Sequence, residues 1–239
     1  MTVDRKFIFT TMYPLEHDKI NLILLLYIYW EPICGTIYEL LKSRLTMNAI
    51  LENILERRSI RAFKEEQIPE DDLNTILMAG SYAPNAKGMQ NWKFTAIQNK
   101  AKIKKVNEAI RQTLLSIPVL QETHPYVASL IEKAKDENAN FLYYAPTFII
   151  VTNLKNNGNS MPESALAIGN MMLVAHSMGI GSCWLNQLPG LNHIPLVREI
   201  LTDLDIPENH IVYGTIVMGY ASEESRPAAP RKNVIHVIR

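Results

Sequence analysis

Hydrophobic residues recur from about residue 47 onward with either helical or extended spacing, and this pattern predicts a series of helices and strands. Spacings of three and four residues, as in Ile50, Leu51, Ile54 and Leu55, are typical of one face of an amphipathic helix. Runs rich in β-branched and aromatic residues predict strands. The expected helices are 47–57, 69–80, 101–115, 126–138 and 161–178, and the expected strands are 92–98, 147–152 and 212–218.

The longest of these helices carries apolar residues on nearly every side. Ser160 and Glu163 form a capping-box pattern at its start, and Gly179 is a favourable C-terminal stop. A helix without a polar face must be buried on most sides, and a subunit interface would bury it economically in a chain of this length. Its apolar positions include Ala165, Leu166, Ile168, Met171, Met172, Val174 and Ala175.

The order of elements favours an α+β fold with a mixed, mainly antiparallel sheet flanked by helices. Strands and helices do not alternate steadily, as they do in doubly wound α/β proteins. No GxGxxG loop follows an expected strand, so a dinucleotide-binding fold of that type is not indicated.

Residues 1–46 lack clear caps and sustained periodicity, so we expect an N-terminal appendage followed by a working domain at 47–239. The alternative is that this segment adds a helix to the body of the domain. Its apolar run at 20–30 is too short for a spanning helix, which needs about 20 apolar residues. No signal-peptide pattern accompanies the run. We therefore expect a cytoplasmic protein without a membrane partner, and a membrane-attached electron carrier is an alternative that rests on 20–30 alone.

The composition narrows the class of protein further. Of 239 residues, 47% are hydrophobic and 20% are charged, which is typical of a globular protein. Lys+Arg and Asp+Glu both number 24, so there is no basic excess of the kind that nucleic-acid binding requires. Cys34 and Cys183 are far apart and form no CxxC pair, so neither a disulfide framework nor a metal site is expected.

Four segments carry candidate chemistry. The first is Arg57-Arg58-Ser59-Ile60-Arg61, where a helix gives way to an extended segment. Arginine forks match phosphate oxygens in bidentate geometry, so this segment indicates an anion site. In an extended stretch Arg57, Ser59 and Arg61 would point the same way. A solvated basic helix end is the structural alternative.

The other three segments are less specific when taken alone. The loop 83–92 is small and polar, which suits close approach of the backbone to a planar ligand, but it could be an ordinary connection. The segment 179–187 is read as a turn that presents backbone N–H groups, with Cys183 as a packed thiol and not a nucleophile. After Gly219-Tyr220, the proline-rich tail carries Arg226, Arg231 and Lys232, which could close over a phosphate or remain solvated.

In their order and spacing, these four segments together resemble the nitroreductase family over roughly residues 47–239. The shared features are Arg-Arg-Ser-Ile-Arg, Ala-Pro-Asn-Ala with Gln-Asn-Trp, Gly-Ile-Gly-Ser-Cys-Trp after an apolar helix, and Gly-Tyr with Pro-Arg-Lys. The resemblance implies an α+β fold in which two subunits interlock. It also implies a homodimer with FMN at its interface.

Carried over residue by residue, the resemblance implies a set of FMN-binding positions. Arg57, Arg58 and Ser59 would hold the phosphate, and Arg61 would lie near the flavin pyrimidine edge and stabilise its negative charge. The remaining positions are Pro84, Asn85, Ala86 and Gly88 from the other subunit, Asn186 and Gln187 near flavin N5, and Arg231 with Lys232 from the tail. Gly88, Asn91 and the pair Asn186-Gln187 depart from residues common in relatives, which bears on substrate preference.

The implied activity is an FMN-dependent oxidoreductase. NADH or NADPH would deliver hydride in a ping-pong cycle, and a nitroaromatic, quinone or related small acceptor would be reduced. Because the cofactor carries the chemistry, no side-chain catalytic dyad is needed. The alternative is a flavin-binding carrier or sensor without efficient turnover.

Overall fold

The computed structural model describes residues 48–232 and 235–239. The chain divides into two units, residues 1–52 and 53–239, and the fold below is that of the second unit. The expected appendage at 1–46, with its apolar run at 20–30, lies outside the described residues. Helix α3, Ala49–Glu56, crosses the boundary between the units, and Asn48 begins it by accepting a hydrogen bond from the Ile50 amide at 2.8 Å.

Within the described residues the core of the fold is a four-stranded antiparallel sheet in the order β1-β2-β4-β3. Its central strands pair over their full length, with Phe148 opposite Val217, and a bulge lies between Val151 and Thr152. The α+β prediction is confirmed, and every strand pair is antiparallel. The strands are β1 Lys93–Ile97, β2 Thr147–Leu154, β3 Gly181–Leu185 and β4 His210–Gly219.

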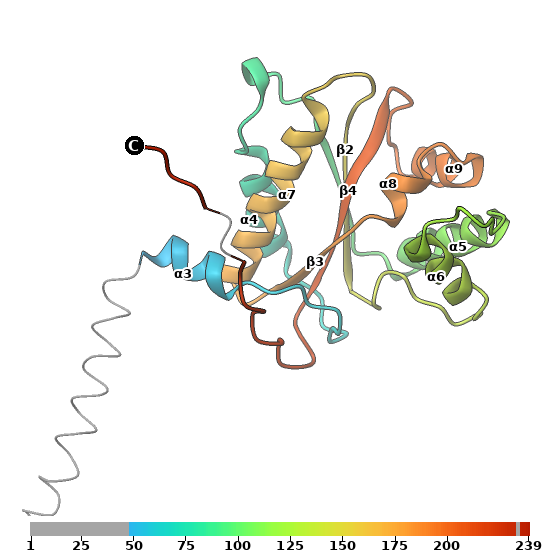
Figure 1. The fold of residues 1–239 in the computed structure, drawn as a ribbon, viewed down its shortest axis with the longest axis horizontal. Coiled ribbons are helices and arrows are strands. Elements are labelled where there is room, and N and C mark those ends of the chain that lie inside the picture. Colours follow the sequence, from blue (N-terminus) through green and yellow to red (C-terminus); the bar gives the residue numbers. More distant parts are fainter. Residues whose placement is uncertain (1–47, 233–234) are drawn as a thin grey trace, which may run out of the picture. The chain divides into compact units, whose positions relative to one another are not determined.

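Helices cover both faces of the sheet (Figure 1). Alternation along β2 explains why, because Ile149 and Val151 pack in the cluster under α4 and α7, while Phe148 and Ile150 pack in the cluster on the other face. Helices α4, Glu70–Ser81, and α7, Ser160–Ser177, lie on the first face. The other face carries α5 Lys100–Ser116, α6 Pro125–Ala134, α8 Gln187–Leu191 and α9 Pro195–Asp203.

The sequence prediction was wrong about the segment that follows α7. Gly179, at φ +73°, ends the helix as expected, and the Ile180 amide donates back to the Ala175 carbonyl at 2.8 Å. The next five residues are not a turn, however, because they form strand β3 at the edge of the sheet. Helices α8 and α9 were not predicted from the sequence either.

An extended segment, 57–64, runs from the end of α3 along the sheet and is fixed by backbone hydrogen bonds. The Ile60 amide donates to the Ser182 carbonyl at 3.0 Å, and the Lys64 amide donates to the Tyr220 carbonyl at 2.8 Å. Gly181 permits this approach, because a Cβ there would come within 2.8 Å of the Ile60 side chain. The segment therefore lies against β3 and the exit of β4.

Helix α7 is buried by its own chain on one side and open on another. Met172 is only 7% exposed and belongs to the core, whereas Leu166 is 48% exposed and Met161 is 67% exposed. The expected capping box is wrong. Asn159 is the N-cap residue, and the Ser160 hydroxyl is buried without a partner among the described residues. The Glu163 carboxylate accepts a hydrogen bond from the Ala86 amide instead.

Among helices of the described ranges, none combines the length and the apolar character that crossing a bilayer requires.

Candidate functional site

A basic pocket of about 620 Å³ lies where segment 57–64 meets the tail that follows β4. Two segments that are far apart in the sequence, Arg57–Ala62 and 223–231, form its walls. Glu223 and Glu224 also line it and partly balance its charge. Lys232 is exposed and is not among the lining residues. The basic side chains that line the pocket are Arg57, Arg58, Arg61, Arg226 and Arg231.

Two neighbouring arginines in this pocket differ in their partners. The Arg58 guanidinium turns back to the end of α3, where Nη1 donates to the Leu55 carbonyl at 2.6 Å and to the Arg57 carbonyl at 2.8 Å. Arg58 therefore satisfies backbone carbonyls that the helix end leaves free. Nη1 of Arg57 is buried without a partner among the described residues. A buried charged donor of this kind fits an anionic ligand such as a phosphate.

Ser59 lies on the same pocket wall, opposite Ser182 of β3, with which it forms a parallel bridge. The Ser182 hydroxyl is buried and has no partner within the described part of the chain. Cys183 follows it on the opposite face of the strand, and burial raises the pKa of its thiol, so the thiol stays protonated at neutral pH. Sequence reasoning did not single out Ser182, because it read this segment as a turn.

A smaller pocket of about 210 Å³ adjoins the basic pocket and shares Arg57 and Arg58 with it. His176, from the last turn of α7, lines it. Burial lowers the pKa of His176. Glu56 opposes this shift, and Arg57 and Arg58 add to it. The lowered pKa favours the neutral imidazole, so the positive charge at this end of α7 comes from the guanidinium groups of the arginines.

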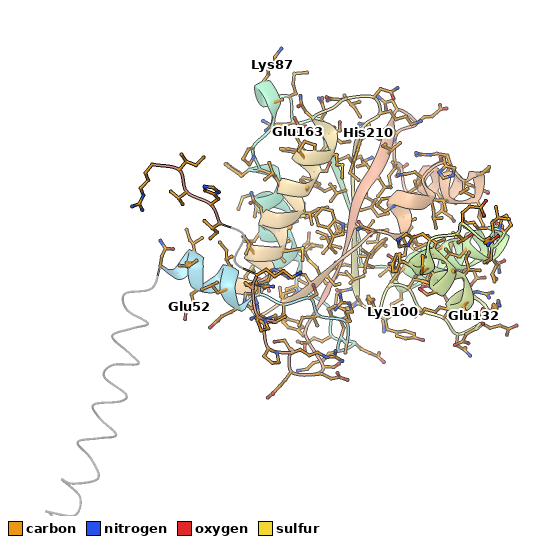
Figure 2. The ribbon with its side chains drawn as sticks, in the orientation of Figure 1. Glu52, Lys87, Lys100, Glu132, Glu163 and His210 are labelled. Carbon is orange, nitrogen blue, oxygen red and sulfur yellow. The ribbon has the colours of Figure 1, made fainter. Side chains whose placement is uncertain are left out.

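The loop that carries Pro84, Asn85, Ala86 and Gly88 lies at the other end of α7. Ala86 contacts Glu163 in the first turn of that helix, and Figure 2 shows Lys87 and Glu163 at the same end of it. His176 is 13 residues further on, a rise of about 20 Å at 1.5 Å per residue. Within one chain the loop and the arginines therefore do not come together.

Asn186 and Gln187 follow the far end of β3. Asn186 comes four residues after Ser182, a distance of about 13 Å at roughly 3.3 Å per residue. Asn186 is exposed and accepts a hydrogen bond from the Trp184 indole at 2.6 Å. Gln187 begins α8, and its Oε1 is buried without a partner among the described residues. Strand β3 thus joins the basic pocket to a second group of polar side chains.

In the described ranges, no three His, Cys, Asp or Glu side chains are grouped so that they could hold a metal ion.

Comparison with known proteins identifies relatives that match most of the chain. Residues 54–220 match the sequence pattern of a family that is described as "Nitroreductase family". A protein of Methanothermobacter thermautotrophicus described as an NADH dehydrogenase/NAD(P)H nitroreductase is 32% identical over 178 residues, which cover 73% of this chain and 78% of that relative. A protein of Archaeoglobus fulgidus with the same description is 28% identical, over 74% of this chain and 88% of that relative.

Among solved structures, the chain is similar to a nitroreductase with bound FMN from Bacteroides fragilis. The two are 38% identical, and the TM-score is 0.74. The match covers 81% of this chain and 100% of that one.

Proposed function

The chain belongs to the nitroreductase family, and from this premise we propose that it is an FMN-dependent oxidoreductase that uses NAD(P)H to reduce small acceptors such as nitroaromatics or quinones. The observation that carries the proposal is Nη1 of Arg57, which is buried in a pocket of arginines and has no partner among the residues that the structure describes. A terminal phosphate would supply the charged acceptor that this donor lacks.

Arg57, Ser59 and Arg231 are the residues that we assign to the phosphate. All three line the basic pocket. The Ser59 hydroxyl can donate, and the two guanidinium groups can each donate to two phosphate oxygens. Arg58 would contribute positive charge while its Nη1 remains on the end of α3. We assign no direct contact to Lys232, since it does not line this pocket.

Bound FMN would accept hydride from NAD(P)H and pass the reducing equivalents on to the acceptor. Arg61 lies in the same extended segment as Arg57 and Ser59, and its fixed positive charge would stabilise negative charge on the ring system. Asn186 and Gln187 would contact the ring at the far end of β3. Since the segment 57–64 and β3 are hydrogen-bonded to each other, these groups are held in place before any ligand arrives.

We further propose that the active unit is a homodimer with two shared sites. In their own chain, the loop 84–88 and the arginines lie at opposite ends of α7, whose rise from Glu163 to His176 is about 20 Å, so a second copy would have to bring this loop to the pocket. The open side of α7, with Leu166 at 48% exposure, is an apolar surface on which that copy could pack.

The test is the identity of the bound cofactor and its turnover. We expect the purified protein to release FMN on denaturation, identified by mass, and to oxidise NADH or NADPH when a nitroaromatic or quinone is present. Release of FAD, or no flavin binding at micromolar concentration, would contradict the cofactor assignment. FMN binding without acceptor-dependent turnover would instead indicate a flavin carrier or sensor.

A further inference from the structure

The buried carboxylate of Glu163 forms a hydrogen bond with the backbone of the loop 84–90 and so connects this loop to the interior of the fold. Glu163 is 5% exposed and lies in the first turn of α7. Its Oε1 accepts a hydrogen bond from the Ala86 amide at 2.8 Å. Its Oε2 accepts one from Nδ2 of Asn153, a fully buried residue of β2, at 3.3 Å. The loop is therefore tied to both the helix and the sheet through one side chain.

The loop needs such a tie because its backbone is strained. Lys87, Gly88 and Gln90 all have positive φ, at 55°, 66° and 48°, and two of them are not glycine. Inside the loop, Asn85 supports this shape by accepting a hydrogen bond from the Gln90 amide at 3.1 Å. Among the described residues, Glu163 is the one side chain outside the loop that hydrogen-bonds to its backbone.

We propose that Glu163 is a positioning residue for cofactor binding, which sets the position of the loop 84–88 and so completes the FMN site of the second subunit. The inference rests on the proposed function, because the loop matters to FMN only if the site is shared. Glu163 itself does not touch the cofactor. It acts through the Ala86 amide, at the opposite end of α7 from its own chain's arginines.

The chemistry of the contact requires a carboxylate. Oδ1 of Asn153 already accepts a hydrogen bond from the Leu154 amide at 2.8 Å, so Nδ2 must face Glu163. Glu163 therefore meets two donors, and only a carboxylate offers an acceptor to each. With a glutamine at this position, the side-chain NH₂ group would face either the Ala86 N–H or the Asn153 NH₂ group, depending on its orientation. Two donors would then face each other in a buried site, which is energetically costly.

This geometry yields a rescue experiment. Glu163→Gln should raise the dissociation constant for FMN about tenfold and speed amide hydrogen exchange in 84–90. Adding Asn153→Asp should restore the dissociation constant to within about threefold of the wild-type value. The carboxylate introduced at position 153 would accept a hydrogen bond from the amide NH₂ introduced at position 163, and the amide oxygen at 163 would still accept from the Ala86 N–H. Glu199→Gln, on the exposed side of α9, is the matched control.

The proposal is overturned if the single variant binds FMN as the wild type does, or if the double variant binds no better than the single. A lower melting temperature with unchanged FMN affinity would also overturn it, because it would show a role in stability alone. Should the single variant fail to fold, recovery of both folding and wild-type affinity in the double variant still supports the proposal, and recovery of folding without FMN affinity contradicts it.

Mixed dimers test whether Glu163 acts across the subunit boundary. One chain carries Arg57→Ala, which damages the pocket, and the other carries Glu163→Gln, which damages the loop. If each site combines the pocket of one chain with the loop of the other, the mixed dimer has one intact site and should bind one FMN with wild-type affinity. Two weak sites would place the loop in its own chain's site and overturn the proposal. Wild-type affinity in the Arg57→Ala homodimer would instead contradict the phosphate assignment, independently of Glu163.

Discussion

At the scale of single residues, Arg57 and Arg58 show how position decides the use of a guanidinium. The two are adjacent in the sequence, yet Arg58 closes the end of α3 while Arg57 keeps a buried Nη1 without a partner among the described residues. Sequence reasoning identified both as anion ligands, because the arginine-rich motif carries that information. It placed Arg57, and not Arg58, on the same side as Ser59 and Arg61, but it could not assign Arg58 to the end of α3, since that use depends on where the helix ends.

Replacing these two arginines one at a time should separate a ligand contact from a helix cap. Arg57→Ala should weaken FMN binding by roughly ten- to a hundredfold, because a charge-assisted contact is worth about 1.5–3 kcal/mol. Arg58→Ala should mainly lower the melting temperature, because the carbonyls of Leu55 and Arg57 lose their donor. Flavin titration and thermal unfolding on both variants measure the difference. Equal losses of affinity would refute the distinction.

The stability of the protein should fall at mildly acidic pH. Burial lowers the pKa of His210 below its ordinary value of 6.5, and Lys93 lowers it further. The imidazole is buried and lies 3.2 Å from the Thr152 hydroxyl. Because the folded-state pKa is below that of the unfolded chain, the stabilisation is fully present above about pH 6.5 and is lost as the pH falls below it.

His210→Gln should make the free energy of unfolding less dependent on pH between about 7 and 5. His193→Gln is the control, because His193 is exposed on the surface. Chemical denaturation at a series of pH values gives the comparison. If the wild type and His210→Gln lose stability in parallel as the pH falls, His210 is not a source of the effect.

Other residues could not be assigned from the sequence because their partners come from distant segments. Glu163 stands three residues after Ser160, which is typical of a capping box, but it bonds to Ala86 and Asn153 instead. Ser182 belongs to the candidate site only because Ser59, from a distant segment, lies opposite it. The local sequence pattern identifies a residue type that suits a given role. The tertiary contacts of that residue determine whether it has this role in the folded protein.

At the scale of elements, the segments with a clear local pattern were predicted correctly, including the five-residue strand β1, whereas β3, α8 and α9 were not. Strand β2 follows from its run of β-branched and aromatic residues, α5 from its apolar spacing, and α7 from a long apolar run that ends at Gly179. Strand β3 has five residues, follows Gly179 and begins with Gly181, so its sequence resembles a turn. It becomes a strand because it pairs with β4, and sequence periodicity does not reveal that partner.

Two substitutions on α7 should separate the proposed interface from the core. Leu166→Glu places a charge on the open side of the helix, where it should prevent dimerisation and weaken FMN binding while each chain stays folded. Met172→Glu places the charge in the core and should prevent folding. Light scattering, circular dichroism and flavin absorbance distinguish the two. A wild-type dimer formed by the Leu166→Glu protein would show that this side of α7 is not the interface.

At the scale of the whole molecule, we propose that residues 47–239 form the FMN-binding domain and that residues 1–46 are an appendage to it. All residues assigned to FMN lie within this range, and the family match covers 54–220. A chain that starts at Met47 should therefore fold, dimerise and bind FMN with an affinity close to that of the full chain. Gel filtration and flavin titration measure both properties. Insoluble or flavin-free protein would show that residues 1–46 contribute to the fold.

The most direct test of the central claim is an anaerobic titration of the FMN-loaded protein with NADH and, separately, with NADPH. We expect at least one of them to bleach the visible flavin absorbance in proportion to the amount added, and a nitroaromatic or quinone to restore it. Arg57→Ala should show the same colour change only at FMN concentrations raised to offset its weaker binding. Flavin that is bound at full occupancy but is bleached by neither nicotinamide would contradict the assignment of this chain as an NAD(P)H-dependent oxidoreductase.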